Sequence, residues 1–529
     1  MNLKNVLTCL LVINLLSCSA LPHKSNATAD INNVILVIGD GMGPQQVGLL
    51  LAYARQAPHS IIKDHITAFD RLMQNGQLSI SLTHSADSLV TDSAASATQL
   101  ATGHLARPEM IGIDQYGNAQ ENIISKAKRL GKSTGLVSDT RITHATPAAF
   151  AAHQAHRSME SEIAEDLLQA EPDVMLSAGL SYWLPESVNH TVYQQHFNGL
   201  GKNLKSKRHD QKDLLSAAKN KGYTLAFNKQ QLQQAQGKTL GLFADTSMVN
   251  GISEAQQQDN PLRQQPTLQE MTQQALSILE KNDQGFFLMV EAGQIDWAGH
   301  QNDTGLLLHE MLRINTTLNT LLDWLKDHEN TLLIVTADHE TGGFGFSYSA
   351  GKLADPIYLP GDAFANKHSF QAQFSFGSPT ILDRLYQQKL SYNDIFKLFD
   401  DLPKQRQTPT ELVNIINSNS EFPITEQQAQ TILSIEENPL YIQGHKYLGS
   451  HKVAKMPVNG AFFPYQADNR ANLLAQAVAT QQQAVWSTGT HTSTPVYAFI
   501  QGSEPTLQPF KKILHHTDLG NLAIQAFKP

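Results

Sequence analysis

Acidic side chains and histidines follow three apolar runs of this 529-residue sequence. The runs and the polar residues after them are residues 34–38 with Asp40, residues 286–290 with Glu291, Asp296 and His300, and residues 331–336 with Asp338 and His339. Ligands of parallel sheets bind beyond the carboxyl ends of the strands, so these side chains are expected at one edge. Crowded carboxylates resist ionisation unless cations neutralise them. Bound metal is the simplest interpretation, although Asp40 or Asp338 alone could equally cap a helix.

The available ligand atoms limit which metals could bind. Both cysteines, Cys9 and Cys18, lie in the N-terminal segment, and the chain has 21 histidines. A mature fold without cysteine cannot offer thiolate ligands. A mixed set of carboxylates and imidazoles suits zinc or a similar divalent ion, and a carboxylate-rich pocket suits magnesium.

A serine suited to nucleophilic attack lies in residues 90–98. A polar loop there runs into small, helix-favouring residues that continue to about Gly103, which places Ser93 at a helix N-terminus. Free N–H groups and the helix dipole attract an anion such as phosphate at that position. A serine hydroxyl attacks only when a base or a metal lowers its pKa, and the sequence shows no serine-hydrolase elbow. Activation by metal is therefore favoured.

Arg157 is the candidate cation for an anionic substrate. It ends the segment 144–157, whose composition favours a helix. A guanidinium group can hold two phosphate oxygens at once. Taken alone, an exposed salt-bridged arginine is the commoner explanation, but the neighbouring motifs favour the phosphate role.

Five short β-rich runs predict the strands that position these residues: 34–38, 133–138, 286–290, 331–336 and 495–500. The expected helices are 45–55, preceded by Pro44, 267–281, with capping-box spacing between Thr267 and Glu270, and 303–326. The pattern predicts the α/β class, with a mostly parallel central sheet flanked by helices on both faces. Residues 348–483 are polar, rich in turns and fit this pattern poorly, so we interpret them as an inserted accessory region.

The N-terminal residues have the character of an export signal. Residues 1–20 contain Lys4, an apolar run and then small residues, an order typical of a secretory signal peptide. The segment Leu15-Leu16-Ser17-Cys18 resembles the lipobox of bacterial lipoproteins, in which the cysteine is lipidated; an ordinary cleaved signal is the alternative. We expect a signal peptide at 1–20, a linker at 21–32 and one large domain at 33–529, exported to the periplasm and anchored to the membrane by lipid.

The composition bounds the partners. The net charge of −9 argues against a nucleic-acid-binding surface, because binding to a phosphate backbone normally needs a basic surface. A small anionic substrate would then need local cations, which agrees with the metal and arginine candidates.

Residues 90–98, Val-Thr-Asp-Ser-Ala-Ala-Ser-Ala-Thr, match the active-site signature of the alkaline phosphatase family at every position. The other motifs occur in that family's order and spacing, and the resemblance covers residues 33–346 and 485–527. It implies hydrolysis of phosphate monoesters to an alcohol and inorganic phosphate through a phosphoserine intermediate on Ser93. Asp92, Ser93 and Arg157 would bind the substrate, with Arg157 as the phosphate clamp.

The resemblance also implies two zinc ions and a third divalent ion, magnesium in the usual case. The ligands of one zinc would be Asp296, His300 and His491. Those of the second would be Asp40, Asp338, His339 and Ser93. Asp40 would also face the third ion, together with Thr146 and Glu291. Composition alone does not select His491, which lies just before the last expected strand.

Two positions depart from the best-known bacterial form of the family. That form has an aspartate in place of His144 and a lysine in place of Trp297, whereas other branches carry this histidine and tryptophan. Imidazole shifts metal preference toward zinc or cobalt, so the third ion is either magnesium or an ion that His144 binds directly. Four further histidines near the motifs, His153, His309, His515 and His516, are expected to have supporting or structural roles.

By resemblance, the protein is expected to form a homodimer.

Two alternative functions are considered beside hydrolysis of phosphate monoesters. A phosphodiesterase or sulfatase of the same superfamily would share the metal ligands, but it usually has a threonine or a modified cysteine as nucleophile and no counterpart of Arg157. A non-catalytic lipoprotein that binds metal or phosphate fits poorly with an intact Ser93, Arg157 and ligand set.

Overall fold

The computed structural model describes residues 31–188, 204–351, 353–365, 368–457 and 459–527. The expected signal peptide at 1–20, the lipidation candidate Cys18 and nearly all of the linker at 21–32 lie outside the described residues. Within the described ranges, no helix is long and apolar enough to cross a membrane.

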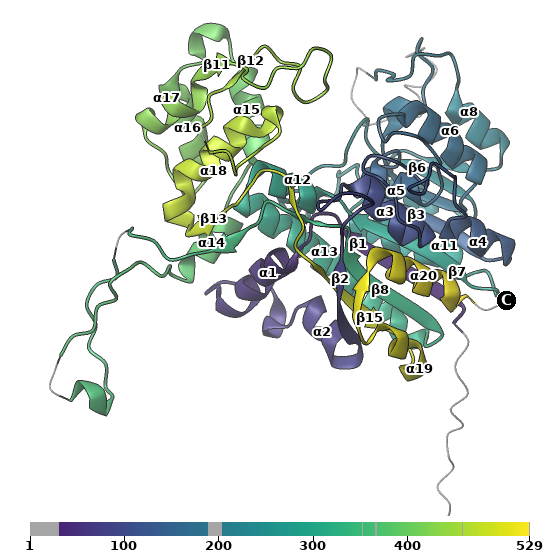
Figure 1. The fold of residues 1–529 in the computed structure, drawn as a ribbon, viewed down its shortest axis with the longest axis horizontal. Helices are drawn as coiled ribbons and strands as arrows, with labels where there is room; N and C mark the ends of the chain where they lie inside the picture. The colour runs from purple at the N-terminus through teal and green to yellow at the C-terminus, as the bar shows by residue number, and fades with distance from the viewer. Residues whose placement is uncertain (1–30, 189–203, 352, 366–367, 458, 528–529) are drawn as a thin grey trace, which may run out of the picture.

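A ten-stranded sheet forms the centre of the molecule (Figure 1). In spatial order its strands are β16 (Ile513–His515), β2 (Gln77–Leu82), β15 (Val496–Gln501), β8 (Thr331–Ala337), β1 (Asn33–Gly39), β7 (Phe286–Ala292), β3 (Ser133–Arg141), β4 (Val174–Ala178), β6 (Thr239–Leu242) and β5 (Thr224–Ala226). Only β15 runs antiparallel to its neighbours, β2 and β8. The predicted mostly parallel sheet is confirmed, and the five predicted runs are β1, β3, β7, β8 and β15.

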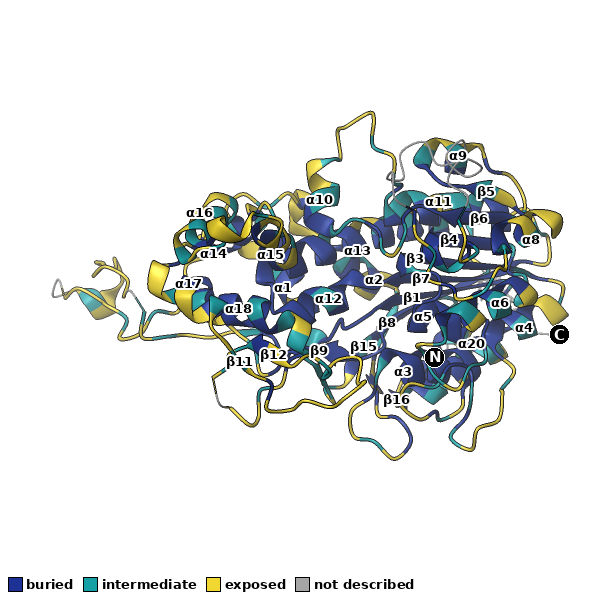
Figure 2. Cartoon of the chain, turned by 90° about the horizontal axis from the view of Figure 1, so that it is seen from above, coloured by how far each residue is buried: buried dark blue, intermediate teal, exposed yellow. Residues whose placement is uncertain are grey.

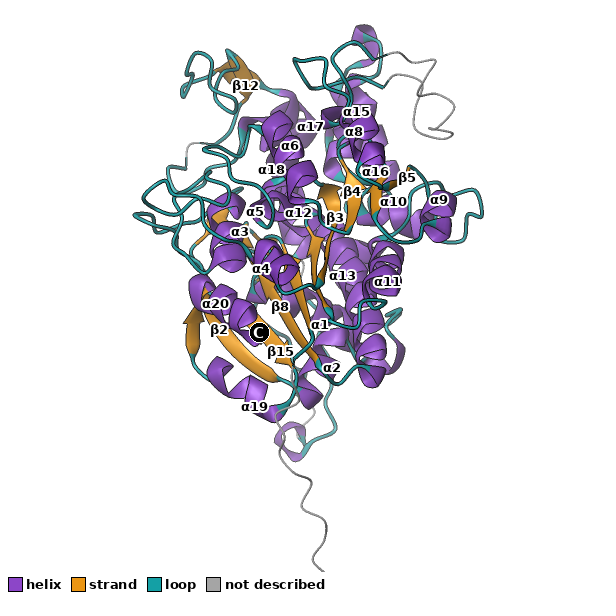
Figure 3. Ribbon diagram, turned by 90° about the vertical axis from the view of Figure 1, so that its right-hand side faces the viewer, coloured by secondary structure: helices purple, strands orange, loops and turns teal. Residues whose placement is uncertain are grey.

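Helices cover both faces of the sheet (Figure 3). Side chains alternate along β1, so that Ile35 and Val37 pack into one core and Val34, Leu36 and Ile38 into the other. The first core includes α1 (Pro44–Gln56), α2 (Ala68–Asn75), α11 (Leu268–Leu279) and α13 (Thr304–Trp324). The second includes α3 (Ser93–Thr102), α4 (Ile123–Arg129), α6 (Glu160–Ala170), α8 (Leu214–Asn220) and α20 (His516–Ala526). The sheet and the inner sides of these helices are buried (Figure 2).

The helix predictions hold where the chain has clear start signals. Pro44 is the first residue of α1, and Thr267 with Glu270 forms the predicted capping box of α11. The prediction for residues 144–157 is wrong beyond the first turn, since α5 spans only Ala145–Ala149. The chain then leaves the helix to pair with another loop, in which the N–H of Arg157 donates to the carbonyl of Glu109 at 2.8 Å. Long-range pairing overrides the local helix preference there.

The expected accessory region has more regular structure than its composition indicates. Its elements are α14 (Thr380–Tyr386), α15 (Tyr392–Asp400), α16 (Pro409–Asn419), α17 (Glu426–Leu433), α18 (Asn469–Gln482) and the hairpin β11 (Ile435–Glu437) with β12 (Lys452–Ala454). Helix α18 packs on α12 (Gln294–Gln301), and α14 packs on α1 and α13 (Figure 1). The region therefore stands beside the carboxyl edge of the sheet, where the candidate site residues lie.

Candidate active site

Three adjacent strands end level at the centre of the sheet. Gly39 of β1 pairs with Ala292 of β7 and with Ala337 of β8. Asp40 and Asp338 therefore leave neighbouring strands at the same edge, and both are fully buried. The prediction that parallel strands bring carboxylates to one edge of the sheet is confirmed for Asp40 and Asp338.

The next acidic residues come from β7 and from the short helix that follows it. Glu291 lies in β7, one residue before the strand ends. Helix α12 carries Asp296 and His300 one turn apart, so both side chains face the same side.

The turn after Asp40 requires glycine. Gly41 has a φ of +72°, and its N–H donates to Oδ1 of Asp338 at 3.1 Å. A Cβ atom at this position would lie 2.7 Å from Cα of Asp296 and 2.8 Å from Oγ1 of Thr341. Only glycine allows the segments that carry the site to approach this closely.

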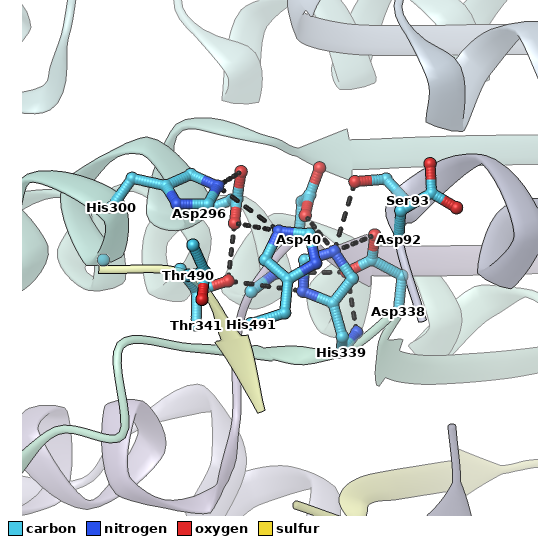
Figure 4. Close-up of polar contacts among 12 residues, drawn as sticks. Asp40, Asp92, Ser93, Asp296, His300, Asp338, His339, Thr341, Thr490 and His491 are labelled. Carbon is cyan, nitrogen blue, oxygen red and sulfur yellow. Dashed lines mark hydrogen bonds and ion pairs between the residues drawn. The ribbon is translucent and has the colours of Figure 1, made fainter. Parts of the chain in front are cut away.

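Asp296, His300 and His491 form one group of ligand-type atoms (Figure 4). Nε2 of His300 lies 3.2 Å from Oδ2 of Asp296 and 3.3 Å from Nε2 of His491. His491 arrives from the far end of the chain because β14 (His491–Thr492) pairs with β9 (Glu340–Thr341). The structure thus brings together the three residues that the family resemblance assigns to one zinc.

The second group surrounds His339. Its Nε2 lies 3.2 Å from Oγ of Ser93, 3.3 Å from Oδ2 of Asp338 and 3.5 Å from Oδ1 of Asp40. The rings of His339 and His491 stack with centroids 3.6 Å apart, and ligand atoms of Asp296, His339 and His491 lie within 4.8 Å of one another. The two groups are therefore directly adjacent (Figure 4).

A third group contains His144. Ligand atoms of Asp40, His144 and Glu291 lie within 4.8 Å of one another. The ring of His144 contacts Trp297 edge to face at 6.1 Å, and its Nε2 accepts a hydrogen bond from Arg157 at 3.3 Å. His144, whose ring contacts Trp297, therefore lies beside the Asp40 carboxylate, which also belongs to the second group.

Several buried polar atoms in these groups have no hydrogen-bond partner within the described ranges. They are both carboxylate oxygens of Asp40, Oδ2 of Asp338, Oε1 of Glu291, Nδ1 of His144 and Oγ1 of Thr146. Unpaired buried polar atoms cost free energy, and buried charges are stable only when paired or bound to metal. Oxygen and nitrogen donors arranged in this way fit a centre of several divalent cations.

The pKa values of the buried carboxyl groups also indicate that the site lacks compensating positive charge. Burial, with the charges of Asp338 and Asp296, raises the pKa of Asp40 well above its usual value. Burial also raises the pKa of Asp338 to about 7 and that of Glu291 to about 8. Bound cations would restore the ionised forms of these acids.

The imidazoles are oriented by hydrogen bonds from Nδ1. The partners are the carbonyl of Gly489 for His300 at 2.8 Å, the carbonyl of Thr91 for His491 at 2.9 Å and Oγ1 of Thr341 for His339 at 3.3 Å. A proton held on Nδ1 leaves the Nε2 lone pair free, which is the usual state of a metal-binding histidine.

Ser93 begins α3, as the sequence predicts, with Asp92 as the N-cap. Oδ1 of Asp92 accepts from the N–H groups of Ala95 at 3.1 Å and Glu109 at 3.0 Å, and Oδ2 accepts from Arg157 at 2.9 Å. Burial raises the pKa of Asp92, but Arg157 and the two N–H groups more than offset this and hold it below its usual value. Asp92 thereby links Arg157 to the N-terminus of α3, where Ser93 lies.

A cavity of about 320 Å³ opens onto Ser93, Arg157 and the Asp296 group. The accessory region supplies part of its wall, through Asn393, Tyr447, Tyr465 and Asp468. The sequence analysis did not select these four residues. They lie in loops or at helix ends of a region without periodic pattern, so no local signal could have identified them.

The four additional histidines are outside the three groups. His516 supports the site, since its Nε2 donates to the carbonyl of Asp338 at 2.8 Å. His153, His309 and His515 bond instead to the carbonyls of Gln120, Tyr386 and His84. The expectation of supporting or structural roles agrees with these contacts.

The sheet is mostly parallel, and its carboxyl edge presents carboxylates and imidazoles beside a serine at a helix N-terminus. This combination of fold and site is typical of metal-dependent phosphate hydrolases. Residues 31–523 match the alkaline phosphatase family, and the chain belongs to that family. It is accordingly a phosphoric monoester hydrolase.

Relatives and solved structures agree with this assignment. The chain is 32% identical to alkaline phosphatase 4 of Bacillus subtilis (strain 168) over 440 residues, which cover 80% of this chain and 85% of the relative. The crystal structure of a cold-active alkaline phosphatase from a psychrophilic Shewanella species is similar with a TM-score of 0.66 and 25% identity, covering 94% of this chain and 100% of that one. The alkaline phosphatase of Thermus thermophilus shares the fold with a TM-score of 0.73 at 24% identity, over 97% and 96% of the two chains.

Proposed function

We propose that this enzyme cleaves phosphate monoesters through a phosphoserine intermediate on Ser93. The observation that carries the proposal is the position of the Ser93 hydroxyl, 3.2 Å from Nε2 of His339 at the N-terminus of α3. The cavity beyond it is lined by Arg157, which Asp92 holds in place. A nucleophile, an anion-binding helix end and a guanidinium group therefore meet at one point.

The metal centre is proposed to hold two zinc ions and a third divalent ion. The ligands of one zinc are Asp296, His300 and His491, and those of the second are Asp40, Asp338, His339 and Ser93. The third ion is proposed to lie between Asp40, Thr146 and Glu291. It is magnesium, or zinc or cobalt where His144 binds it directly. Divalent ions at these positions supply Lewis-acid stabilisation of the attacking and leaving oxygens.

The residues of the chain bind and orient the phosphoryl group and supply the nucleophile. Arg157 and the free N–H groups of α3 bind the phosphoryl oxygens and align phosphorus with Ser93. Oγ of Ser93 forms a bond to phosphorus while the bond to the ester oxygen breaks, and the electron pair leaves with that oxygen. The proton lost by the serine hydroxyl is matched by the proton that the leaving oxygen takes up to form the alcohol. The oxygen of a water molecule then forms a bond to phosphorus while the bond between phosphorus and Oγ of Ser93 breaks. A proton from that water restores the serine hydroxyl, and inorganic phosphate is the product.

The test compares hydrolysis of a chromogenic phosphomonoester with that of the matching diester and sulfate at pH 7 and pH 10. Wild-type protein and Ser93→Ala are assayed, and bound zinc and magnesium are counted by elemental analysis. Fast monoester cleavage at alkaline pH that collapses in Ser93→Ala, with about two zinc ions per chain, supports the proposal. Preferential turnover of diester or sulfate would assign the chain to a sister activity, and metal-loaded protein without turnover would favour a binding role.

We further propose that the enzyme is exported to the periplasm and anchored there by lipid on Cys18. The lipobox-like sequence before Cys18 supports this proposal. Metabolic labelling with a radioactive fatty acid should label the wild-type protein and leave Cys18→Ser unlabelled. Equal absence of label in both proteins would indicate an ordinary cleaved signal.

Association into a homodimer is also proposed. Residues 347–351, 353–365 and 368–378 form an extended arm that leaves the body of the molecule at the lower left of Figure 1, held by bridges between Ser349 and Ser375 and between Ile357 and Phe370. Large apolar side chains are exposed along it: Tyr348, Ile357, Tyr358, Phe370, Phe374 and Phe376. An exposed apolar surface of this kind is typical of an interface. Light scattering should give twice the chain mass, and polar replacement of Phe374 and Phe376 should reduce it.

A further inference from the structure

The wall that the accessory region contributes to the active-site cavity contains an aromatic pair, Tyr447 and Tyr465. Tyr447 lies in the loop between β11 and β12, and Tyr465 lies just before α18. Figure 1 shows this part of the accessory region above α12, the helix that carries Asp296 and His300. The pair therefore belongs to the part of the cavity wall that the accessory region supplies.

The backbone around Tyr465 is tied to the segment that precedes His491. Pro464 and Gly489 form a parallel bridge, and the N–H of Gly489 donates to the carbonyl of Phe463 at 3.1 Å. The carbonyl of Gly489 in turn accepts from Nδ1 of His300. Tyr465 is thus positioned by the same backbone that orients the imidazole of His300 and leads into His491.

The ring of Tyr465 is held on both sides. Its centroid lies 4.7 Å from that of His300 and 4.8 Å from that of Tyr447, with which it stacks at an interplanar angle of 22°. Nζ of Lys446 lies 5.0 Å from the centroid of Tyr447 and extends the stack. These contacts fix the ring, so the direction of its hydroxyl is fixed as well.

The hydroxyl of Tyr465 makes no hydrogen bond with any residue that the structure describes, although the side chain is half-buried and lines the cavity. It interacts electrostatically with Asp296 and with Arg157, which line the same cavity. The hydroxyl is not among the buried unpaired atoms, so it is accessible to a molecule that enters the cavity. A bound phosphomonoester would bring acceptor oxygens into that cavity.

We propose that Tyr465 contacts the leaving group, and that its hydroxyl donates a hydrogen bond to the ester oxygen of the phosphomonoester. The inference rests on the proposed function and adds a specificity-determining residue from the accessory region. Negative charge grows on the ester oxygen as the phosphorus–oxygen bond breaks, and a fixed donor stabilises that charge. Tyrosine keeps its proton throughout, so the proton balance of the reaction is unchanged.

The donor has a larger effect on some substrates than on others. An alkyl phosphate releases a strongly basic alkoxide, whereas 4-nitrophenyl phosphate releases a phenolate whose charge is already delocalised. Loss of the hydroxyl should therefore slow cleavage of the alkyl ester more. The accessory region would in this way extend the range of substrates to esters with poor leaving groups.

The experiment measures kcat/KM of the metal-loaded enzyme for glycerol phosphate and for a series of substituted phenyl phosphates. The proteins are wild type, Tyr465→Phe and the control Tyr441→Phe, an exposed tyrosine of the same β11–β12 loop that stacks on His451 outside the cavity. Tyr465→Phe should lower kcat/KM for glycerol phosphate about tenfold. The loss should shrink toward 4-nitrophenyl phosphate, so that the dependence of kcat/KM on leaving-group pKa becomes steeper. Tyr441→Phe should match the wild type.

The outcomes separate this inference from the proposed function. A wild-type enzyme that cleaves none of the phosphomonoesters would overturn both. An active wild type with an equal loss on every substrate in Tyr465→Phe would show that the hydroxyl has a structural role and does not act on the leaving group. Unchanged kinetics in Tyr465→Phe would show that the hydroxyl does not contact the leaving group.

Discussion

Nδ1 of His491 lies 2.9 Å from the carbonyl oxygen of Thr91, although 400 positions separate the two residues in the sequence. Thr91 is two residues before Ser93, so this hydrogen bond joins a candidate metal ligand to the backbone that carries the proposed nucleophile. The protonated Nδ1 also leaves Nε2 free for a metal. Orientation of the imidazole and placement of the serine are therefore coupled in this fold.

Replacement of Arg157 should weaken substrate binding and turnover together. Arg157→Ala removes a bidentate charged contact to phosphate and should lower kcat/KM about 100-fold. Arg157→Lys keeps the charge without the fork geometry, so its kcat/KM should fall between those of the wild type and Arg157→Ala.

Asp92→Asn keeps the acceptor for the N–H groups of Ala95 and Glu109 but loses the ion pair with Arg157, so a loss of about tenfold in kcat/KM is expected. Steady-state kinetics with a chromogenic monoester measure all three, and an Asp92→Asn loss larger than that of Arg157→Ala would contradict the positioning role.

Removal of metal should destabilise the protein as well as inactivate it. When the cations are chelated, the buried carboxyl groups of Asp40 and Asp338 lose their compensating charge and must either stay unpaired or take up protons, and both cost stability. Zinc at a thousandfold excess over its Kd should restore about 4 kcal/mol of stability. Thermal unfolding followed by circular dichroism, before and after chelation and with zinc added back, measures this.

Asp40→Asn tests the cause of that instability. The neutral amide relieves repulsion in the metal-free protein, so its Tm should depend less on zinc than that of the wild type. An undiminished zinc response would show that other residues account for the stabilisation.

Asp303 connects the catalytic core to the accessory region. Its carboxylate caps α13 through the N–H of Leu306 at 3.0 Å and also accepts from Gln388 Nε2 and the N–H of Tyr392, each at 2.8 Å. Asp303→Ala should cost about 2 kcal/mol in the free energy of unfolding. It should also raise KM, because the accessory wall of the cavity loosens.

A cap outside this junction provides the comparison for Asp303. Asn122 caps α4 by accepting from the N–H of Ser125 at 2.9 Å. Asn122→Ala should destabilise by about 1 kcal/mol and leave KM unchanged. A similar rise of KM in both variants would mean that general destabilisation is responsible.

Acid sensitivity should depend in part on Glu270. Burial raises the pKa of this carboxyl, but hydrogen bonds from Arg263, Lys229 and the N–H of Thr267 outweigh burial and lower it to about 2. Because the folded pKa is below the usual 4.5, the stabilisation is complete above about pH 4.5 and is lost as pH falls toward 2. After allowance for solvent screening it amounts to about 1–2 kcal/mol at pH 7.

Glu270→Gln isolates this contribution. Urea unfolding of chelated protein at pH 7 should show the variant to be less stable than the wild type. At pH 3 the difference should be smaller, because the wild-type carboxyl is closer to protonation. If the difference in the free energy of unfolding between the two proteins is the same at both pH values, the stabilisation comes from packing or from the capping box instead of from charge.

The fold was predictable from the sequence where one local rule decides the outcome. Apolar runs buried on both faces predict β1, β7 and β8, and Pro44, Thr267 and Asp303 correctly start three helices. The short strands β2, β4, β5, β6 and β16 have weaker patterns that the sequence analysis did not resolve. The helix expected through residue 157 ends at Ala149 because pairing with a distant loop outweighs local preference.

By itself, the sequence determined the α/β class, the carboxylates at the strand ends and the serine at a helix N-terminus. Each follows from residues adjacent in the chain, because a parallel sheet carries strand ends to one edge. Only the tertiary structure decided how close the groups are. Pairing of β9 with β14 stacks His491 on His339, and packing of α18 on α12 brings Tyr465 to the cavity. Such contacts depend on the packing of distant segments, which leaves no trace in local pattern.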